Sequence, residues 1–376
     1  MAQKSGQPPR ATGSKRRTIP INDLVRHTAA IRPVIDGAIA EVLDSGWYVL
    51  GPKVEEFEVA FAEMCRAGEA VGVANGTDAL EIALRALGVG RGDEVITVAN
   101  AGGYSTTAIV AVGAKAVYSE IDPVTLLADE SQVKDRIGPR TAAIIVTHLY
   151  GRAAPVDRIV ALAGPKGIPV IEDCAQAHGA SVAGRSVGGW GTLGCFSFYP
   201  TKNLGALGDA GAITGSDADL IARVRRMRQY GWGDKYRAVD IGGRNSRLDE
   251  VQAAVLSAQL PLLTGWNRRR RDIGDAYRKD ITHPRIVHIP YGEADILHLA
   301  VVWTGERASL RAHLADLAVG TDVHYPHPDY AALADNTIRL EHTEAACTSV
   351  LTLPCFPEMT DVEVTTVIEA VNSWPA

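Results

Sequence analysis

Long hydrophobic runs are missing from this sequence of 376 residues. The longest apolar stretches, such as Ala142–Val146 and Ile168–Ile171, have the length of a β-strand, whereas a membrane-spanning helix needs about 20 apolar residues. Aromatic residues make up 6% and charged residues 22%, an ordinary globular mixture that excludes wholesale disorder. Because domains commonly hold about 100–200 residues, a chain of this length predicts two of them.

Cysteine is scarce, and its spacing is uninformative. The five cysteines form no Cys-x-x-Cys pair and no cluster with histidine, which argues against a metal site. We expect them to be small buried side chains in a reducing compartment, the cytoplasm. They are Cys65, Cys174, Cys195, Cys347 and Cys355.

An excess of positive charge is also absent. The 44 acidic residues outnumber the 38 basic ones, which argues against a nucleic-acid surface. Residues 1–17 are basic but lack the apolar core of a signal peptide, so we expect a disordered leader. The sequence thus predicts a cytoplasmic protein that binds neither nucleic acid nor a membrane.

Helical and strand patterns alternate along the first two thirds of the chain. Helices are expected after Ile21 and from Pro52, and later at Asp78–Leu87 and Val156–Ala163. Such alternation predicts a mostly parallel sheet covered on both faces, with ligands beyond the carboxyl ends of its strands. The expected strands are 70–74, 95–98, 116–119, 142–147, 168–172 and 194–198.

The last third of the chain has a different pattern. A long helical stretch interrupted near Pro261 carries the basic run Arg268–Arg271, which we interpret as a solvated helix face linking two domains. Short strands and a helix follow it and indicate a smaller α+β domain. We place the large domain at 18–260 and the smaller one at 261–376.

The first segment suited to chemistry follows the first expected strand. Asn75-Gly-Thr77 opens a helix there, and the free N–H groups of a helix start favour an anion such as phosphate at Gly76–Thr77. The alternative is a plain helix cap made by Thr77 or Asp78.

Two further segments each hold one ionisable residue in an unusual place. Asp173 ends a buried strand, where a carboxylate needs a cationic partner such as a protonated heterocycle, unless it only caps a loop. Lys202 lies among Phe198, Tyr199 and Leu204. Desolvation there would lower the pKa of its amine and make it a nucleophile toward carbonyls; an exposed loop lysine is the alternative.

Together these segments resemble a known family. The ordered motifs NGTDAL, EDCAQAHGA, SFYPTKNLGALGDAG and GGRNSRLDEVQAA are similar to those of the DegT/DnrJ/EryC1/StrS sugar aminotransferases. The resemblance implies the α/β, aspartate-aminotransferase-like (type I) fold, with a mostly parallel seven-stranded sheet between helices and a smaller α+β C-terminal domain. It also implies pyridoxal 5'-phosphate (PLP) as cofactor and a homodimer with shared active sites.

The resemblance assigns roles by position. Lys202 would form the Schiff base with PLP, Asp173 would pair with the pyridinium nitrogen, and Gln176 would hydrogen-bond the phenolic oxygen. The phosphate would be held by Gly76, Thr77 and Ser197.

Other positions extend the resemblance or depart from it. Asn245, expected at a helix start, resembles the asparagine that reaches the neighbouring subunit's phosphate, and His324 and Tyr325 resemble sugar contacts. Where many members carry an aromatic that stacks on the cofactor, this chain has Ala101-Gly-Gly-Tyr104. We therefore assign the stacking role to Tyr104.

The motifs also favour one substrate class. Ser45–Gly51, AGGYSTT and the Lys202 segment resemble the branch that acts on nucleotide-linked (dTDP) 3-keto-6-deoxyhexoses with L-glutamate as amino donor. The alternatives are a 4-keto-sugar or cyclitol aminotransferase and a non-catalytic PLP-binding sensor. A nicotinamide enzyme is less well supported, since no convincing Gly-x-Gly-x-x-Gly turn is present.

Overall fold

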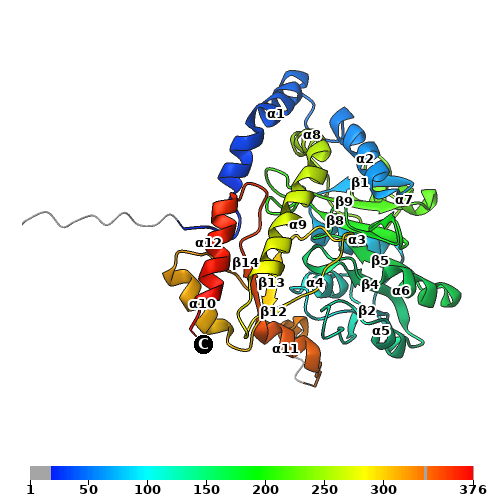
Figure 1. Cartoon of the computed structure of the whole chain (residues 1–376). Coiled ribbons are helices and arrows are strands. Elements are labelled where there is room, and N and C mark those ends of the chain that lie inside the picture. Colours follow the sequence, from blue (N-terminus) through cyan, green and yellow to red (C-terminus); the bar gives the residue numbers. More distant parts are fainter. Residues whose placement is uncertain (1–17, 334–336, 376) are drawn as a thin grey trace, which may run out of the picture.

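A computed structural model describes residues 18–333 and 337–375 of the chain. The expected disordered leader, residues 1–17, lies outside the described residues. One large sheet holds seven strands in the order β1-β9-β8-β5-β4-β2-β3 (Figure 1). In that order the strands are Glu69–Val73, Gly211–Gly215, Leu193–Ser197, Val170–Asp173, Thr141–Thr147, Glu94–Thr97 and Lys115–Tyr118.

Six of the seven strands point in the same direction, so the expected mostly parallel sheet is confirmed. Only β9 runs antiparallel to both of its neighbours, β1 and β8. The sequence pattern did not predict β9, a short Ala-Ile-Thr run between two glycines. Its direction follows from its connection, because β8 returns into β9 without a crossover helix.

Helices cover both faces of the sheet, as the alternation of buried side chains requires. Val95 and Ile145 belong to the core under α3, α4 and α7, whereas Ile96 and Ile144 belong to the core on the opposite face with α5 and α6. Phenylalanines 57, 61, 196 and 198 join α2 to that opposite face. The covering helices are α2 Pro52–Cys65, α3 Gly76–Ala86, α4 Tyr104–Ala111, α5 Glu130–Arg136, α6 Val156–Ala163, α7 Ala218–Met227 and α8 Glu250–Gln259.

A second core lies at the other end of the molecule, in the yellow to red elements of Figure 1. It is built around an antiparallel sheet of β12 Val287–His288, β13 Ala300–Trp303 and β14 Val350–Leu353. Helices α9 Leu263–Asp280, α10 Arg307–Asp316, α11 Glu341–Ser349 and α12 Asp361–Asn372 accompany this sheet, and Ile19 from the start of the described chain packs into the same core.

The remaining elements are the first helix and two small hairpins. The first helix, α1 Leu24–Ser45, packs against α8. Two small hairpins are formed by β6 Ser181–Val182 with β7 Arg185–Ser186 and by β10 Trp232–Asp234 with β11 Arg237–Ala238. Among the described residues, no helix has both the length and the apolar character that a membrane crossing requires.

Candidate active site

A cavity of about 710 Å³ opens beyond the carboxyl ends of the parallel strands, where the two cores meet. The strands β1, β5 and β8 each end in a predicted site residue or lead directly into one. All predicted site residues except Asn245 line this cavity: Gly76, Thr77, Tyr104, Asp173, Gln176, Ser197, Lys202, His324 and Tyr325.

Lys202 presents its amine to this cavity. A turn closed by the hydrogen bond from its N–H to the Tyr199 carbonyl, 2.8 Å long, follows β8 and holds the residue there. Burial lowers the pKa of Lys202 to about 8, and the charge of Asp173 opposes that shift. Burial thus produces the predicted desolvation, and roughly a tenth of the amine is unprotonated at pH 7.

Asp173 is the last residue of β5 and is buried. Burial raises the pKa of its carboxyl group, while the Ala175 N–H at 3.1 Å and the charge of Lys202 oppose the rise. These contacts leave the carboxylate incompletely compensated, which suits a cationic ligand in the cavity.

The start of α3 lies against the end of β8. Asn75 caps the helix by accepting the Asp78 N–H at 2.8 Å, so the alternative cap by Thr77 or Asp78 is wrong. A Cβ atom on Gly76 would lie 2.6 Å from the Cβ of Ser197, so only glycine allows this close approach. Gly76, Thr77 and Ser197 therefore share one wall, at a helix start suited to phosphate.

Gln176 is held from both ends of its side-chain amide. Its Oε1 accepts the Tyr150 N–H at 2.7 Å, and its Nε2 donates to the Tyr325 hydroxyl at 2.9 Å. The Tyr150 hydroxyl in turn donates to the His324 carbonyl. Tyr150, which sequence reasoning missed, thus joins the large sheet to the His324–Tyr325 segment.

Packing against Tyr325 explains the first of the two glycines before Tyr104. Gly102 has a φ of +83°, and a Cβ atom there would lie 2.8 Å from the Tyr325 ring. The ring of Tyr325 therefore occupies space that a larger residue at position 102 would need. Tyr104 begins α4, is half-exposed to the cavity, and meets the Tyr325 ring edge-on at 6.2 Å between centroids.

A substitution pair tests this packing. Gly103 also has a positive φ, +82°, but a Cβ atom there would meet nothing within 4 Å. Gly103→Ala is expected to cost only the backbone strain of about 1 kcal/mol, and Gly102→Ala about 2 kcal/mol more because it also displaces Tyr325. Unfolding midpoints in urea measure both, and equal losses would contradict the role given to Gly102.

Two expectations about polar residues are wrong. Arg270, in the middle of the basic run, is not solvated: its side chain is 4% exposed and lines the cavity. Asn245 does not begin a helix, because α8 starts at Glu250 with Asp249 as its cap. It lies instead in extended backbone paired with Gln229, exposed and outside the cavity of its own chain.

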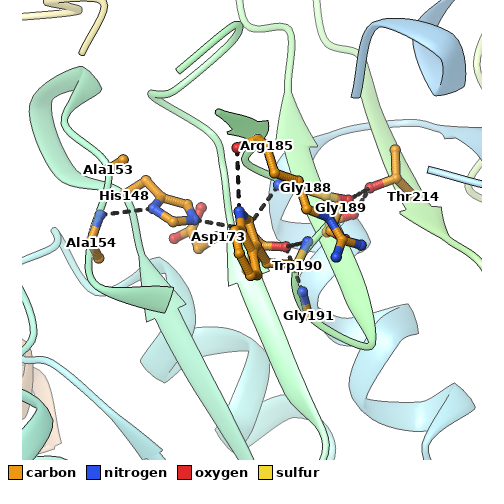
Figure 2. Close-up of polar contacts among 12 residues, drawn as sticks. His148, Ala153, Ala154, Asp173, Arg185, Gly188, Gly189, Trp190, Gly191 and Thr214 are labelled. Atoms are coloured by element: carbon orange, nitrogen blue, oxygen red, sulfur yellow. Dashed lines mark hydrogen bonds and ion pairs between the residues drawn. The ribbon is translucent and has the colours of Figure 1, made fainter. Parts of the chain in front are cut away.

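Behind Asp173, the opposite face of β5 carries a buried polar cluster that sequence reasoning missed. His148, Glu172 and Cys174 place one potential ligand atom each within 4.8 Å of one another. His148 accepts the Ala154 N–H on Nδ1, so its Nε2 carries the proton and donates to Glu172 at 3.1 Å (Figure 2). Burial raises the pKa of the Cys174 thiol, which stays protonated. Hydrogen bonding thus satisfies the imidazole without a metal.

Glu172 anchors the loop that precedes β8. It accepts the backbone N–H groups of Gly188, Trp190 and Gly191 at 2.7–2.8 Å, in addition to His148. Burial acts to raise its pKa, but the hydrogen bond from His148 and these N–H donors outweigh it, so the pKa of Glu172 lies below its ordinary 4.5. The carboxylate is therefore structural.

Glu172→Gln is expected to destabilise the protein by about 3 kcal/mol at pH 7, because N–H donors would face the new amide nitrogen. A carboxyl group whose pKa is lower in the folded state stabilises the fold at pH values above its unfolded-state pKa. That contribution is lost as the pH falls through the folded-state pKa. The deficit should therefore shrink below about pH 4.5. Urea unfolding at pH 7 and pH 4, with the exposed Glu56→Gln as control, measures it; a pH-independent deficit would contradict the ionised state.

Comparisons with known proteins agree with this geometry. The model of the DegT/DnrJ/EryC1/StrS aminotransferase family matches residues 30–372. The chain is 41% identical to the dTDP-3-amino-3,4,6-trideoxy-alpha-D-glucose transaminase of Streptomyces venezuelae, over 95% of this chain and 96% of that one. It is 43% identical to the dTDP-3-amino-3,6-dideoxy-alpha-D-galactopyranose transaminase of Aneurinibacillus thermoaerophilus, over 95% and 99%.

The fold has an equally close counterpart among solved structures. The structure of DesV from S. venezuelae in complex with a ketimine intermediate superposes with a TM-score of 0.92 at 40% identity, over 95% of this chain and 98% of that one. The expected aspartate-aminotransferase-like architecture is confirmed. The chain belongs to the DegT/DnrJ/EryC1/StrS aminotransferase family.

Proposed function

We propose that this protein is a PLP-dependent aminotransferase that moves an amino group from L-glutamate to a dTDP-linked 3-keto-6-deoxyhexose in the cytoplasm. The observation that carries the proposal is the desolvated amine of Lys202 in one cavity with the buried carboxylate of Asp173. A 3-keto substrate is favoured because both curated relatives described above are transaminases of dTDP-3-amino sugars.

The residues present fit the cofactor. In bound PLP, the ring nitrogen would form an ion pair with Asp173 and the phenolic oxygen would accept a hydrogen bond from Gln176. The aldehyde carbon would lie next to Nζ of Lys202. Its phosphate would lie at the start of α3, against Gly76, Thr77 and Ser197. Bound there, PLP supplies an electron sink that stabilises negative charge on the carbon losing its proton.

The chain's own residues account for the rest of the reaction. Nζ of Lys202, with a pKa near 8, can accept a proton from one carbon and return it to another at neutral pH. Asp173 keeps a ring nitrogen beside it protonated. A cavity of about 710 Å³ has the size that a nucleotide sugar and an amino acid need in turn.

We further propose a homodimer with shared active sites. Asn245 is exposed and lies outside the cavity of its own chain, as a residue that serves the neighbouring subunit's phosphate site should. Mixing inactive Lys202→Ala with Asn245→Ala should restore activity, because one hybrid site carries neither substitution. No recovery after proven subunit exchange would mean that each subunit builds its site alone.

A substrate panel tests the proposed reaction. The purified protein with PLP and L-glutamate should aminate dTDP-3-keto-6-deoxyhexoses faster than their 4-keto isomers or a keto-cyclitol. Product analysis by mass spectrometry and NMR identifies the position of the new amine. Preferred turnover of a 4-keto sugar would replace the substrate assignment, and PLP binding without turnover of any partner would favour the sensor alternative.

A further inference from the structure

A buried arginine on the cavity wall lacks an anionic partner. The side chain of Arg270 is 4% exposed, and its Nη1 donates to the carbonyls of His298 and Cys355. Within residues 18–333 and 337–375, no carboxylate lies within ion-pair distance of the guanidinium, although the charge of Glu358 acts on it from farther away, and its Nε has no hydrogen-bond partner. The two carbonyls orient the cation but do not neutralise it.

Such a charge is costly unless something compensates it, since buried charges in proteins are generally paired. The other deeply buried arginines of the described chain, Arg228 and Arg152, have partners of two different kinds. Arg228 pairs with Glu58, and Arg152 lies over the Tyr150 ring at 5.5 Å from its centroid. Arg270 has neither kind of partner and faces the cavity, so the missing anion is expected to come from a ligand.

A hydrogen-bonded chain fixes Arg270 relative to Lys202. Asn267, one turn earlier on α9, accepts from Nδ2 of Asn203, which directly follows Lys202, at 2.8 Å. Asn203 Oδ1 accepts a hydrogen bond from Nδ1 of His298 at 2.9 Å. The backbone carbonyl of His298 in turn accepts a hydrogen bond from Nη1 of Arg270. The reacting amine and the unpaired guanidinium thus belong to one rigid unit.

Lys202 and Arg270 both lie close enough to His298 to affect its pKa. Burial, followed by the charges of Lys202 and Arg270, holds the pKa of His298 well below its usual range. The imidazole is therefore neutral and offers no positive charge that could compete for an anion. Arg270 remains the fixed cation on this side of Lys202.

We propose that Arg270 binds the α-carboxylate of the amino-acid donor. This inference rests on the proposed aminotransferase function. In an α-amino acid the carboxylate is bonded directly to the carbon that must face Lys202, whereas the diphosphate of a nucleotide sugar is several bonds from its keto carbon. A planar guanidinium is also well matched to a carboxylate. Arg270 therefore serves the donor half of the reaction and not the sugar half.

The test separates the two halves in single turnovers of the PLP-loaded protein. Arg270→Met should slow the reaction with L-glutamate about 100-fold, and the reaction of the aminated form with the keto sugar less than about 3-fold. Arg270→Lys keeps the positive charge but loses the paired N–H donors of the guanidinium, so its rate with L-glutamate should lie between those of the wild type and Arg270→Met. Arg268→Met is the matched control on the same helix, because Arg268 is exposed, and should match the wild type.

A binding measurement and a donor series add readouts that a structural role would not move. 2-Methylglutamate has no α-hydrogen and cannot complete transfer, so spectral titration gives its affinity, which should fall about 50-fold in Arg270→Met. The wild type should also prefer L-glutamate over its α-amide, isoglutamine, and Arg270→Met should lose that preference.

Two results would overturn the inference: an equal loss in both half-reactions, or an unchanged preference for L-glutamate over isoglutamine. If Arg270→Met does not fold, the same comparison is made with Arg270→Lys. A wild-type protein that accepts an amino group from no amino acid would refute the proposed function itself, which is a different outcome from an insensitive Arg270 variant.

Discussion

Replacing Lys202 with alanine is expected to lower the rate of amino-group transfer by at least about 10⁴-fold, as loss of a group acting directly on the reacting atoms commonly does. Lys202 is the one lysine among the described residues that line the cavity, so no other amine can replace it. Single-turnover absorbance with L-glutamate measures the loss. The exposed Lys166→Ala serves as control.

Two accompanying measurements keep this prediction specific. Lys202→Ala should still retain PLP through Asp173 and the start of α3, and added ethylamine should restore part of the lost rate by accepting the proton. Borohydride should attach the cofactor of the wild type to the peptide that contains Lys202. Attachment to a different lysine would remove the basis of the assignment.

The pKa of Lys202 adds a prediction about pH. Because burial lowers this pKa from 10.5 to about 8, the amine becomes a nucleophile as pH rises through 8. The rate at which cofactor-free protein takes up PLP covalently should therefore rise with a midpoint near pH 8. Asp173→Asn should move that midpoint lower, since it removes the one charge that opposes the shift. A midpoint that stayed near 10 would mean that Lys202 is solvated.

The fold could be predicted where the sequence signal is local. Buried parallel strands are continuous apolar runs, and the six expected strands all formed within two residues of their predicted bounds. The exception is β9, where flanking glycines shorten the apolar run. Glycine is needed there for a tertiary reason, because a Cβ on Gly211 would lie 2.6 Å from the Asn75 backbone.

The grouping of most candidate site residues around one cavity could also be predicted from the sequence. Residues at the ends of adjacent parallel strands converge by topology, which is why Asp173, Ser197 and Lys202 share a wall. Contacts between segments that are far apart in the sequence cannot be predicted from a local pattern in this way. Nothing in the sequence around Arg270 or Tyr150 shows that one is buried against Cys355 and the other contacts His324.

Asp173→Asn is expected to lower kcat by about 100-fold, which corresponds to about 2.7 kcal/mol of transition-state stabilisation. Asparagine has nearly the same shape, so the contact with the Ala175 N–H and the fold should survive. A neutral amide, however, cannot hold a proton on the ring nitrogen of PLP, and the ring then withdraws electrons less strongly.

The comparison must be made at full cofactor occupancy, checked by absorbance, with the exposed Asp219→Asn as control. Reconstitution with N-methylated PLP, whose ring nitrogen is permanently positive, should return part of the lost rate to Asp173→Asn. A structural role for Asp173 would give no such recovery, because the methyl group adds charge without repairing packing. Near-normal turnover of the fully loaded variant with ordinary PLP would refute the pairing.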